Sequence, residues 1–210
     1  MQSLVVGNGE SRNLIDLNAF SKDHILIGCN ALHRDLIVDH LVCCDRRMVE
    51  EAIESPNTSQ TKIYAREDWF KYYRKIKKDR RIHQVPQLPY QGELKQDQPT
   101  NWGSGTYAVL LAAGISQSVS LVGFDLYPVN DKINNIYKDT ANYGKKDSKP
   151  VDYSYWEYQI GRVFQYHPNT NFTIFNTVDW KMPRQWNKSN VSFGIINSLT
   201  SSVKESIIIK

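Results

Sequence analysis

Short apolar runs alternate with stretches of helical periodicity along most of this chain, and few folds accommodate that order. Strands of a parallel sheet are buried on both faces, so they read as near-continuous apolar runs. We predict strands at Ser3–Val6, Ile25–Ile27, Leu41–Cys44, Lys62–Ala65, Val119–Val122 and Phe172–Phe175. We predict helices at Arg46–Ile53, Glu67–Lys77, Ser104–Gly114 and Tyr155–Tyr166. The alternation predicts an α/β fold, a single Rossmann-like domain whose mostly parallel sheet has helices on both faces.

Two stretches lack a period and interrupt this order. Residues 85–103 contain three prolines, and residues 128–150 are polar. Long irregular segments inside a compact domain usually serve as lids or binding loops, so we expect a lid at about 128–150. We therefore predict a nucleotide-binding domain over residues 1–180. Residues 181–210 form a C-terminal extension that packs as an edge element or makes a homo-oligomer contact.

Charge and hydropathy exclude several classes of protein. The 210 residues carry a net charge of +4, from 26 Lys and Arg against 22 Asp and Glu. This balance is mild and does not indicate a nucleic-acid partner, and the basic stretch 71–81 is typical of a solvated helix face. No apolar run approaches the ~20 residues of a membrane helix, and the first residues are too polar for a secretion signal.

The cysteines and histidines indicate the compartment and the absence of metal. The chain has three cysteines, Cys29, Cys43 and Cys44, and all lie in apolar runs. An odd number of such cysteines argues against a set of disulfides and is typical of proteins in a reducing compartment. We therefore expect a cytoplasmic protein without disulfides. The five histidines have no metal-ligand spacing, so we expect neither a metal site nor a cofactor.

A glycine-rich turn follows the first predicted strand. The run Gly7-Asn8-Gly9-Glu10-Ser11 could cradle a phosphate with its amides, and a helix beginning near Ser11 would add its positive end. Arg12 stands where a dinucleotide fingerprint has its third glycine, and no P-loop Gly-Lys-Ser/Thr follows. The alternative is a tight turn between a strand and a helix.

Polar residues end the next two strands on the same predicted edge of the sheet. Asn30 could bind a base or a ribose hydroxyl, because its amide both donates and accepts hydrogen bonds. Asp45 could accept from sugar hydroxyls. The alternatives are a turn at Asn30 and an N-cap at Asp45, which precedes a predicted helix.

Two further motifs fall on this edge. Ser104-Gly105-Thr106 opens the clearest predicted helix, so it is either an N-cap or an anion site made of free amides and hydroxyls. Gly123, Asp125 and Tyr127 follow the fifth predicted strand, and the phenol of Tyr127 could donate to a phosphate oxygen.

In this order the motifs resemble those of the bacterial sialyltransferases that use CMP-sialic acid. The similarity covers residues 3–127, from Gly7-Asn8-Gly9-x-Ser11 through Cys29-Asn30 and Ser104-Gly105 to Gly123-Phe124-Asp125-Leu126-Tyr127. A wider group with this outline includes archaeal-type pterin diphosphokinases and uncharacterised phage and bacterial proteins. The resemblance implies a Rossmann-like domain with a lid, no required metal, and inversion at the anomeric carbon.

By position, the resemblance implies that Asn8 and Asn30 contact the CMP portion and that Tyr127 binds the leaving phosphate. A second phosphate-binding tyrosine belongs in the lid, where Tyr137 is the nearest candidate. Asp45 stands where the family has an asparagine that binds the nucleotide.

The sequence departs from the family where catalysis is concerned. The lid histidine that serves as general base has no counterpart. Asp152 lies in that neighbourhood and would need a raised pKa to take over; the alternative is an acid at the N-terminus of a helix. His167 lies beyond the predicted helix. The arginine that precedes Ser-Gly in the family is also missing, because Trp102 and Gly103 stand there.

Together with the residues at the strand ends, the resemblance implies a glycosyltransferase-like protein. It would bind a nucleotide-sugar, such as a CMP-sialic-acid-like donor, and transfer the sugar to a glycan or small-molecule acceptor. One alternative is a diphosphokinase-like transferase that uses Mg²⁺ held by Asp45 or Asp125. Another is a non-catalytic nucleotide-binding module.

Overall fold

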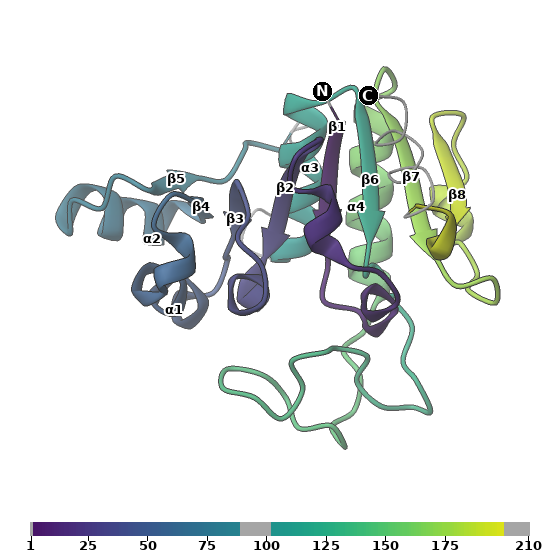
Figure 1. Cartoon of the computed structure of the whole chain (residues 1–210), viewed down its shortest axis with the longest axis horizontal. Helices are drawn as coiled ribbons and strands as arrows, with labels where there is room; N and C mark the ends of the chain where they lie inside the picture. The colour runs from purple at the N-terminus through teal and green to yellow at the C-terminus, as the bar shows by residue number, and fades with distance from the viewer. Residues whose placement is uncertain (1, 89–101, 200–210) are drawn as a thin grey trace.

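The computed structural model describes residues 2–88 and 102–199. Eight strands in these residues form one fully parallel sheet in the order β5-β4-β3-β2-β1-β6-β7-β8 (Figure 1). The strands are β1 Gln2–Val6, β2 His24–Cys29, β3 His40–Val42, β4 Lys62–Ala65, β5 Ile82–Gln84, β6 Ser118–Val122, β7 Asn171–Asn176 and β8 Val191–Ile195. The predicted α/β fold with a parallel sheet is confirmed.

In the described residues, α-helices and several short turns cover the two faces of the sheet. The α-helices are α1 Arg46–Glu54, α2 Glu67–Phe70, α3 Ser104–Ile115 and α4 Ser154–Tyr166. The 3₁₀ turns are η1 Glu10–Leu14, η2 Leu17–Phe20, η3 Asn30–Arg34, η4 Pro56–Thr58 and η8 Arg184–Trp186, and η5 Lys71–Ile76 is a π-helical turn. Side chains of α1, η2 and η3 share one buried cluster, and those of α3, α4 and η8 share the other.

Helix α3 lies at the centre of the second cluster. Nine of its twelve residues are buried, from Ser104 to Ala113. A helix that is apolar all round must be covered on all sides, and α3 packs against the sheet and against α4.

The structure differs from the predicted elements in four places. The predicted helix 67–77 is split into α2 and the π-helical turn η5, and the helix predicted near Ser11 is only the 3₁₀ turn η1. Strands β5 and β8, at the two edges of the sheet, were absent from the prediction. Residues 181–199, part of the predicted extension, supply η8 and β8, while Ile207–Ile209 lie outside the described residues.

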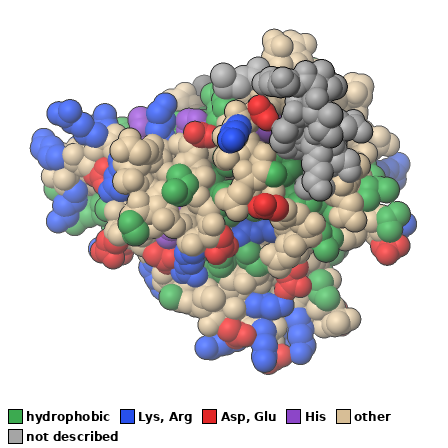
Figure 2. Space-filling view, viewed as in Figure 1, with side chains coloured by type: hydrophobic (Ala, Val, Ile, Leu, Met, Phe, Trp, Pro, Cys, Tyr) green, Lys and Arg blue, Asp and Glu red, His purple; other side chains and the backbone are tan. Residues whose placement is uncertain are grey.

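Basic side chains gather over α2 and η5 and on the loops below the sheet (Figure 2). Within the basic stretch 71–81, Lys71 pairs with Glu67 at 2.5 Å and Arg81 pairs with Asp79 at 2.6 Å. Over the described residues, no helix is both long and apolar enough to cross a membrane.

The strand order reverses at β1. Strands β2 to β5 extend the sheet on one side of β1, and β6 to β8 extend it on the other. In open parallel sheets such a switch point opens a crevice at the carboxyl ends of the central strands, where ligands bind.

Candidate functional site

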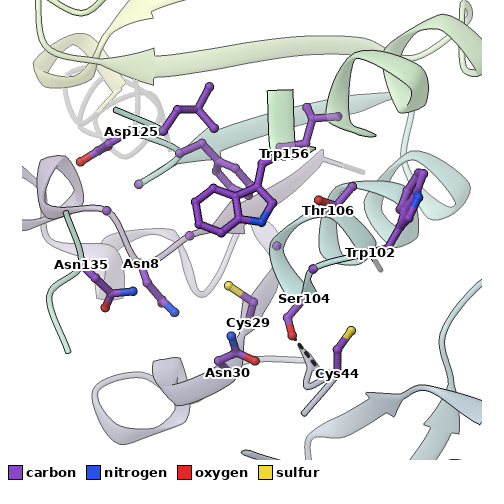
Figure 3. Close-up of a pocket in the computed structure, with 18 of the residues that line it drawn as sticks. Asn8, Cys29, Asn30, Cys44, Trp102, Ser104, Thr106, Asp125, Asn135 and Trp156 are labelled. Carbon is purple, nitrogen blue, oxygen red and sulfur yellow. Dashed lines mark hydrogen bonds between the residues drawn. The ribbon is translucent and has the colours of Figure 1, made fainter. Parts of the chain in front are cut away.

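A cavity of about 380 Å³ lies at this switch point, a size typical of small-molecule sites. Its walls are the carboxyl ends of the central strands, the first turns of α3 and α4, and part of the lid (Figure 3). Most of the predicted site residues line it: Gly7, Asn8, Gly9, Asn30, Asp45, Ser104, Gly105, Thr106, Gly123 and Asp125. Ser11 and Tyr127 do not line the cavity.

Backbone hydrogen bonds to the end of β6 hold the glycine-rich turn in place. The Gly7 amide donates to the Val122 carbonyl at 2.8 Å, and the Gly9 amide donates to the Gly123 carbonyl at 2.9 Å. A Cβ at Gly7 would lie 2.4 Å from the Gly123 oxygen, so the two backbones meet only because both residues are glycines. The expected phosphate cradle is therefore wrong for these amides, and the turn is the alternative one, a tight connection after a strand.

Asp125 braces the same turn. Its carboxylate accepts from the Ser11 amide at 2.9 Å, from the Ser11 hydroxyl, and from Asn176 Nδ2 at 3.2 Å. A Cβ at Gly9 would lie 2.4 Å from the Asp125 Cγ. Ser11 thus acts on the site through Asp125. The carboxylate already has three donors, and no cluster of three or more metal-ligating acidic, histidine or cysteine side chains occurs in the described parts of the chain.

The first turn of α3 keeps its amides free. Gly103, not Ser104, occupies the N-cap position, and the Ser104 hydroxyl accepts from the Cys44 amide at 2.9 Å instead of capping the helix (Figure 3). The first helical hydrogen bond runs from the Tyr107 amide to the Gly103 carbonyl. Within residues 2–88 and 102–199, the amides of Ser104, Gly105 and Thr106 have no partner. They leave the positive end of α3 at the cavity wall.

Two asparagines present buried, unpartnered carboxamide oxygens. Asn8 donates through Nδ2 to the Tyr143 hydroxyl at 3.1 Å, while its Oδ1 has no partner among the described residues. Asn30 begins η3 with φ 51°, and its Oδ1 is also buried without a partner. Leaving a buried acceptor unsatisfied costs about 1–3 kcal/mol, so these atoms indicate a site for hydrogen-bond donors of a ligand.

Asp45 lies at the start of α1 but does not cap it. Its carboxylate makes no hydrogen bond to the helix amides and is 70% exposed, with Arg66 Nη2 at 3.5 Å. Arg66 also donates from Nε to the Cys44 carbonyl at 3.0 Å and lines the cavity. Asp45 thus occupies the N-cap position given as the alternative, but its side chain does not cap the helix. The rim also carries an arginine that the sequence patterns did not single out.

The two tyrosines expected to bind phosphate lie elsewhere. The Tyr127 ring packs edge-on against Tyr153, with centroids 5.0 Å apart, and burial raises the pKa of its phenol. Tyr137 donates to Asp35 at 2.6 Å and accepts from Arg12 at 2.7 Å. Neither tyrosine lines the cavity, so this geometry does not support the roles implied by the resemblance.

The lid segment 128–150 instead supplies Asn134 and Asn135 to the cavity. Asn134 accepts from the Glu10 amide at 3.0 Å and donates to the Tyr127 carbonyl at 3.1 Å, and the Ile136 amide donates to the Asn8 carbonyl at 2.9 Å. These contacts join the lid to the glycine-rich turn.

Other lining residues were also missed by sequence reasoning. They are Cys29, Cys44, Arg66, Trp102, Gly103, Phe124, Leu126, Trp156 and Ile160. Trp156 lies in the first turn of the predicted helix 155–166, close in sequence to the polar segment 128–150, and this position is a signal that could have found it. The others belong to apolar runs or to short turns, where sequence alone does not separate lining from core.

The candidates for a general base are not placed for that role. Asp152 hydrogen-bonds the Ser154 amide at 2.9 Å, and hydrogen bonds to Ser154 lower the pKa of its carboxyl group. The raised pKa that Asp152 would need as a general base is therefore not found, and Asp152 is the alternative, an acid at the N-terminus of a helix. His167 follows the last turn of α4, at the opposite end from Trp156.

Comparisons with known proteins agree with the fold. No family model matches the chain, and no curated protein sequence matches it. The solved structure of MAf glycosyltransferase from Magnetospirillum magneticum AMB-1 is similar over 99% of this chain, with 17% sequence identity and a TM-score of 0.51. This chain spans 36% of the length of that protein. At this identity, the likeness shows a shared α/β fold.

Proposed function

We propose that this protein is glycosyltransferase-like and that its cavity binds a nucleotide-sugar. The donor is CMP-sialic-acid-like, and the acceptor is a glycan or a small molecule. The resemblance of the site motifs to the CMP-sialic-acid sialyltransferases supports this proposal. The similar fold of a protein described as a glycosyltransferase supports it independently.

One observation carries the proposal: a single cavity joins the three unpartnered amides at the start of α3 to the two unpartnered oxygens of Asn8 and Asn30. A helix N-terminus stabilises a phosphate, and carboxamide oxygens accept from hydroxyl or amino groups. A nucleotide carries both kinds of group. Arg66 adds positive charge at the rim.

In the transfer, the bond between the anomeric carbon and the phosphate oxygen breaks, and its electron pair stays on the phosphate. The amides of α3 would stabilise that developing charge by electrostatics. The acceptor oxygen bonds to the carbon and releases its proton. No described side chain is assigned as the base that accepts it.

The non-catalytic alternative rests on a specific observation. Asp152 is hydrogen-bonded with a lowered pKa, and His167 lies at the wrong end of α4. A module that binds a nucleotide-sugar without transferring the sugar fits that arrangement.

Thermal unfolding with added nucleotide tests the proposal. We expect CMP to raise the Tm without metal. Asn8→Ala and Asn30→Gly should each weaken CMP binding about tenfold, because each removes a hydrogen bond to the ligand. Glycine keeps the positive φ of residue 30, and Asn187→Ala at an exposed position serves as the control.

Three outcomes separate the candidates. Stabilisation by ATP only with Mg²⁺ would favour the diphosphokinase alternative. Binding of CMP-sialic acid without transfer or hydrolysis would favour the non-catalytic module. A protein that no nucleotide stabilises would contradict the proposal.

A further inference from the structure

We propose that the indole of Trp156 is the platform on which the sugar ring of the donor stacks, and so a specificity-determining residue. This inference rests on the proposed function and names the part of the ligand that the residue recognises.

The position of Trp156 in the cavity is the first step. It lies in the first turn of α4 and is half-buried, and in Figure 3 its ring projects into the middle of the cavity. Ile160, one turn later on α4, also lines the cavity and is 1% exposed. The N-terminal end of α4 thus presents an apolar wall to the ligand.

The polar atom of the ring is also available to a ligand. Within the described parts of the chain, Trp156 Nε1 makes no hydrogen bond. This nitrogen would lie 3.1 Å from a Cβ placed at Gly103, so the indole N–H lies beside the residue that caps α3. Glycine at 103 leaves the ring room to lie there.

The arrangement places the indole next to the first turn of α3. The unpartnered amides of α3 begin immediately after Gly103, and Asn8 and Asn30 extend from the ends of β1 and β2. If the phosphate binds at α3 and the nucleoside at the asparagines, the group joined to the phosphate lies against Trp156. A pyranose ring has an apolar C–H face and hydroxyls on its rim, which match the apolar face and the N–H of an indole.

Titration calorimetry with CMP and with CMP-sialic acid tests this inference. We expect Trp156→Leu to weaken binding of CMP-sialic acid about tenfold while leaving CMP binding within about twofold of the wild type. Trp156→Phe keeps a ring but loses the N–H, so its loss should be smaller.

Gly103→Ala supplies a second, milder test. Residue 103 has φ −78° and ψ 159°, which alanine adopts without strain, so the change acts through the added methyl against the indole. We expect Gly103→Ala also to weaken binding of CMP-sialic acid more than binding of CMP. Trp69→Leu, on α2 and outside the cavity, is the control and should bind both compounds as the wild type does.

The outcomes distinguish this inference from the proposed function. Equal losses for CMP and CMP-sialic acid in Trp156→Leu would place the ring against the nucleotide and overturn the sugar platform. Unchanged binding of both compounds in Trp156→Leu and Gly103→Ala would overturn it too. A folded wild-type protein that binds neither compound would overturn the proposed function together with this inference.

Discussion

Gly7 and Gly123 determine how closely the chain segments leaving β1 and β6 approach each other. Gly123 has φ +70°, and a Cβ there would lie 2.8 Å from the Gly7 carbonyl oxygen. Both constraints come from backbone atoms, which cannot rotate away as a side chain can. The switch point where the cavity lies is built on this contact.

We expect Gly123→Ala to lower the free energy of unfolding by about 2–4 kcal/mol, because a left-handed alanine is strained and its methyl group overlaps the Gly7 backbone. Gly114→Ala is the matched control. Gly114 lies inside α3, and an added Cβ there has nothing within 4 Å, so this change should stabilise the protein by about 0.5–1 kcal/mol. Urea unfolding followed by circular dichroism measures both, and equal effects would contradict the backbone contact.

At the scale of elements, one buried arginine links the predicted lid segment 128–150 to two other parts of the molecule. Arg12 is 3% exposed, and it donates to the Gly7 carbonyl at 3.1 Å, to Asp35 at 2.9 Å and to the Tyr137 hydroxyl at 2.7 Å. The same guanidinium therefore holds the glycine-rich turn, the loop after η3 and the lid. Tyr143 adds a second attachment through Asn8.

We expect Tyr137→Phe to loosen this attachment, since removal of the hydroxyl takes a partner from both Arg12 and Asp35 and costs about 1–3 kcal/mol. Hydrogen exchange of residues 134–143 should become faster. Tyr166→Phe removes a hydroxyl that accepts from Arg162 at the exposed end of α4, and it should leave lid exchange unchanged. Unaltered exchange in Tyr137→Phe would mean that other contacts hold the lid.

For the whole molecule, the histidines determine how stability responds to mild acid. Burial lowers the pKa of every histidine, because it disfavours the charged imidazolium. These residues are His24, His33, His40, His83 and His167. The unfolded chain, with histidine pKa values of 6.5, binds more protons than the folded protein just below that pH. The stability contribution is therefore complete above pH 6.5 and is lost as the pH falls toward the lowered values.

We expect the free energy of unfolding in urea to be smaller at pH 5.5 than at pH 7.5. His33 is 2% exposed, so His33→Phe should reduce the difference between the two pH values. An identical difference in wild type and His33→Phe would show that this histidine does not contribute to it.

We also predict, for the whole molecule, that residues 181–199 fold and unfold together with the rest of the domain. Trp186 is fully buried, and its Nε1 donates to the Glu157 carbonyl at 2.8 Å. Ending the chain at residue 180 removes this side chain and β8, so we expect the shortened protein to lose its cooperative thermal transition. Trp186→Ala should cost about 3–5 kcal/mol. A cooperative transition at the wild-type Tm in the shortened chain would instead support a domain boundary at 180.

The six predicted strands are confirmed. They could be recognised in the sequence because each carries enough apolar side chains to be buried. The missed strands lie at the sheet edges: β5 has three residues, and β8 leaves Phe193 39% exposed and Ile195 47% exposed. An edge strand is stabilised largely by hydrogen bonds to its neighbour, so its sequence does not need a continuous run of apolar residues. The site edge was predictable, because parallel strands all end at the same side of a sheet.

The sequence by itself determined the class of fold, the edge of the sheet where the cavity lies, and ten of the 21 residues that line it. Only the tertiary structure decided which polar groups remain available there, because a residue far away in the sequence can form a hydrogen bond with a group and leave it unavailable to a ligand. The Asp125 carboxylate accepts from the Ser11 amide, 114 positions away in the sequence. The carbonyls of Val122 and Gly123 accept from the amides of Gly7 and Gly9. Among the described residues, no other segment supplies an acceptor to the first amides of α3, a fact that local patterns do not contain.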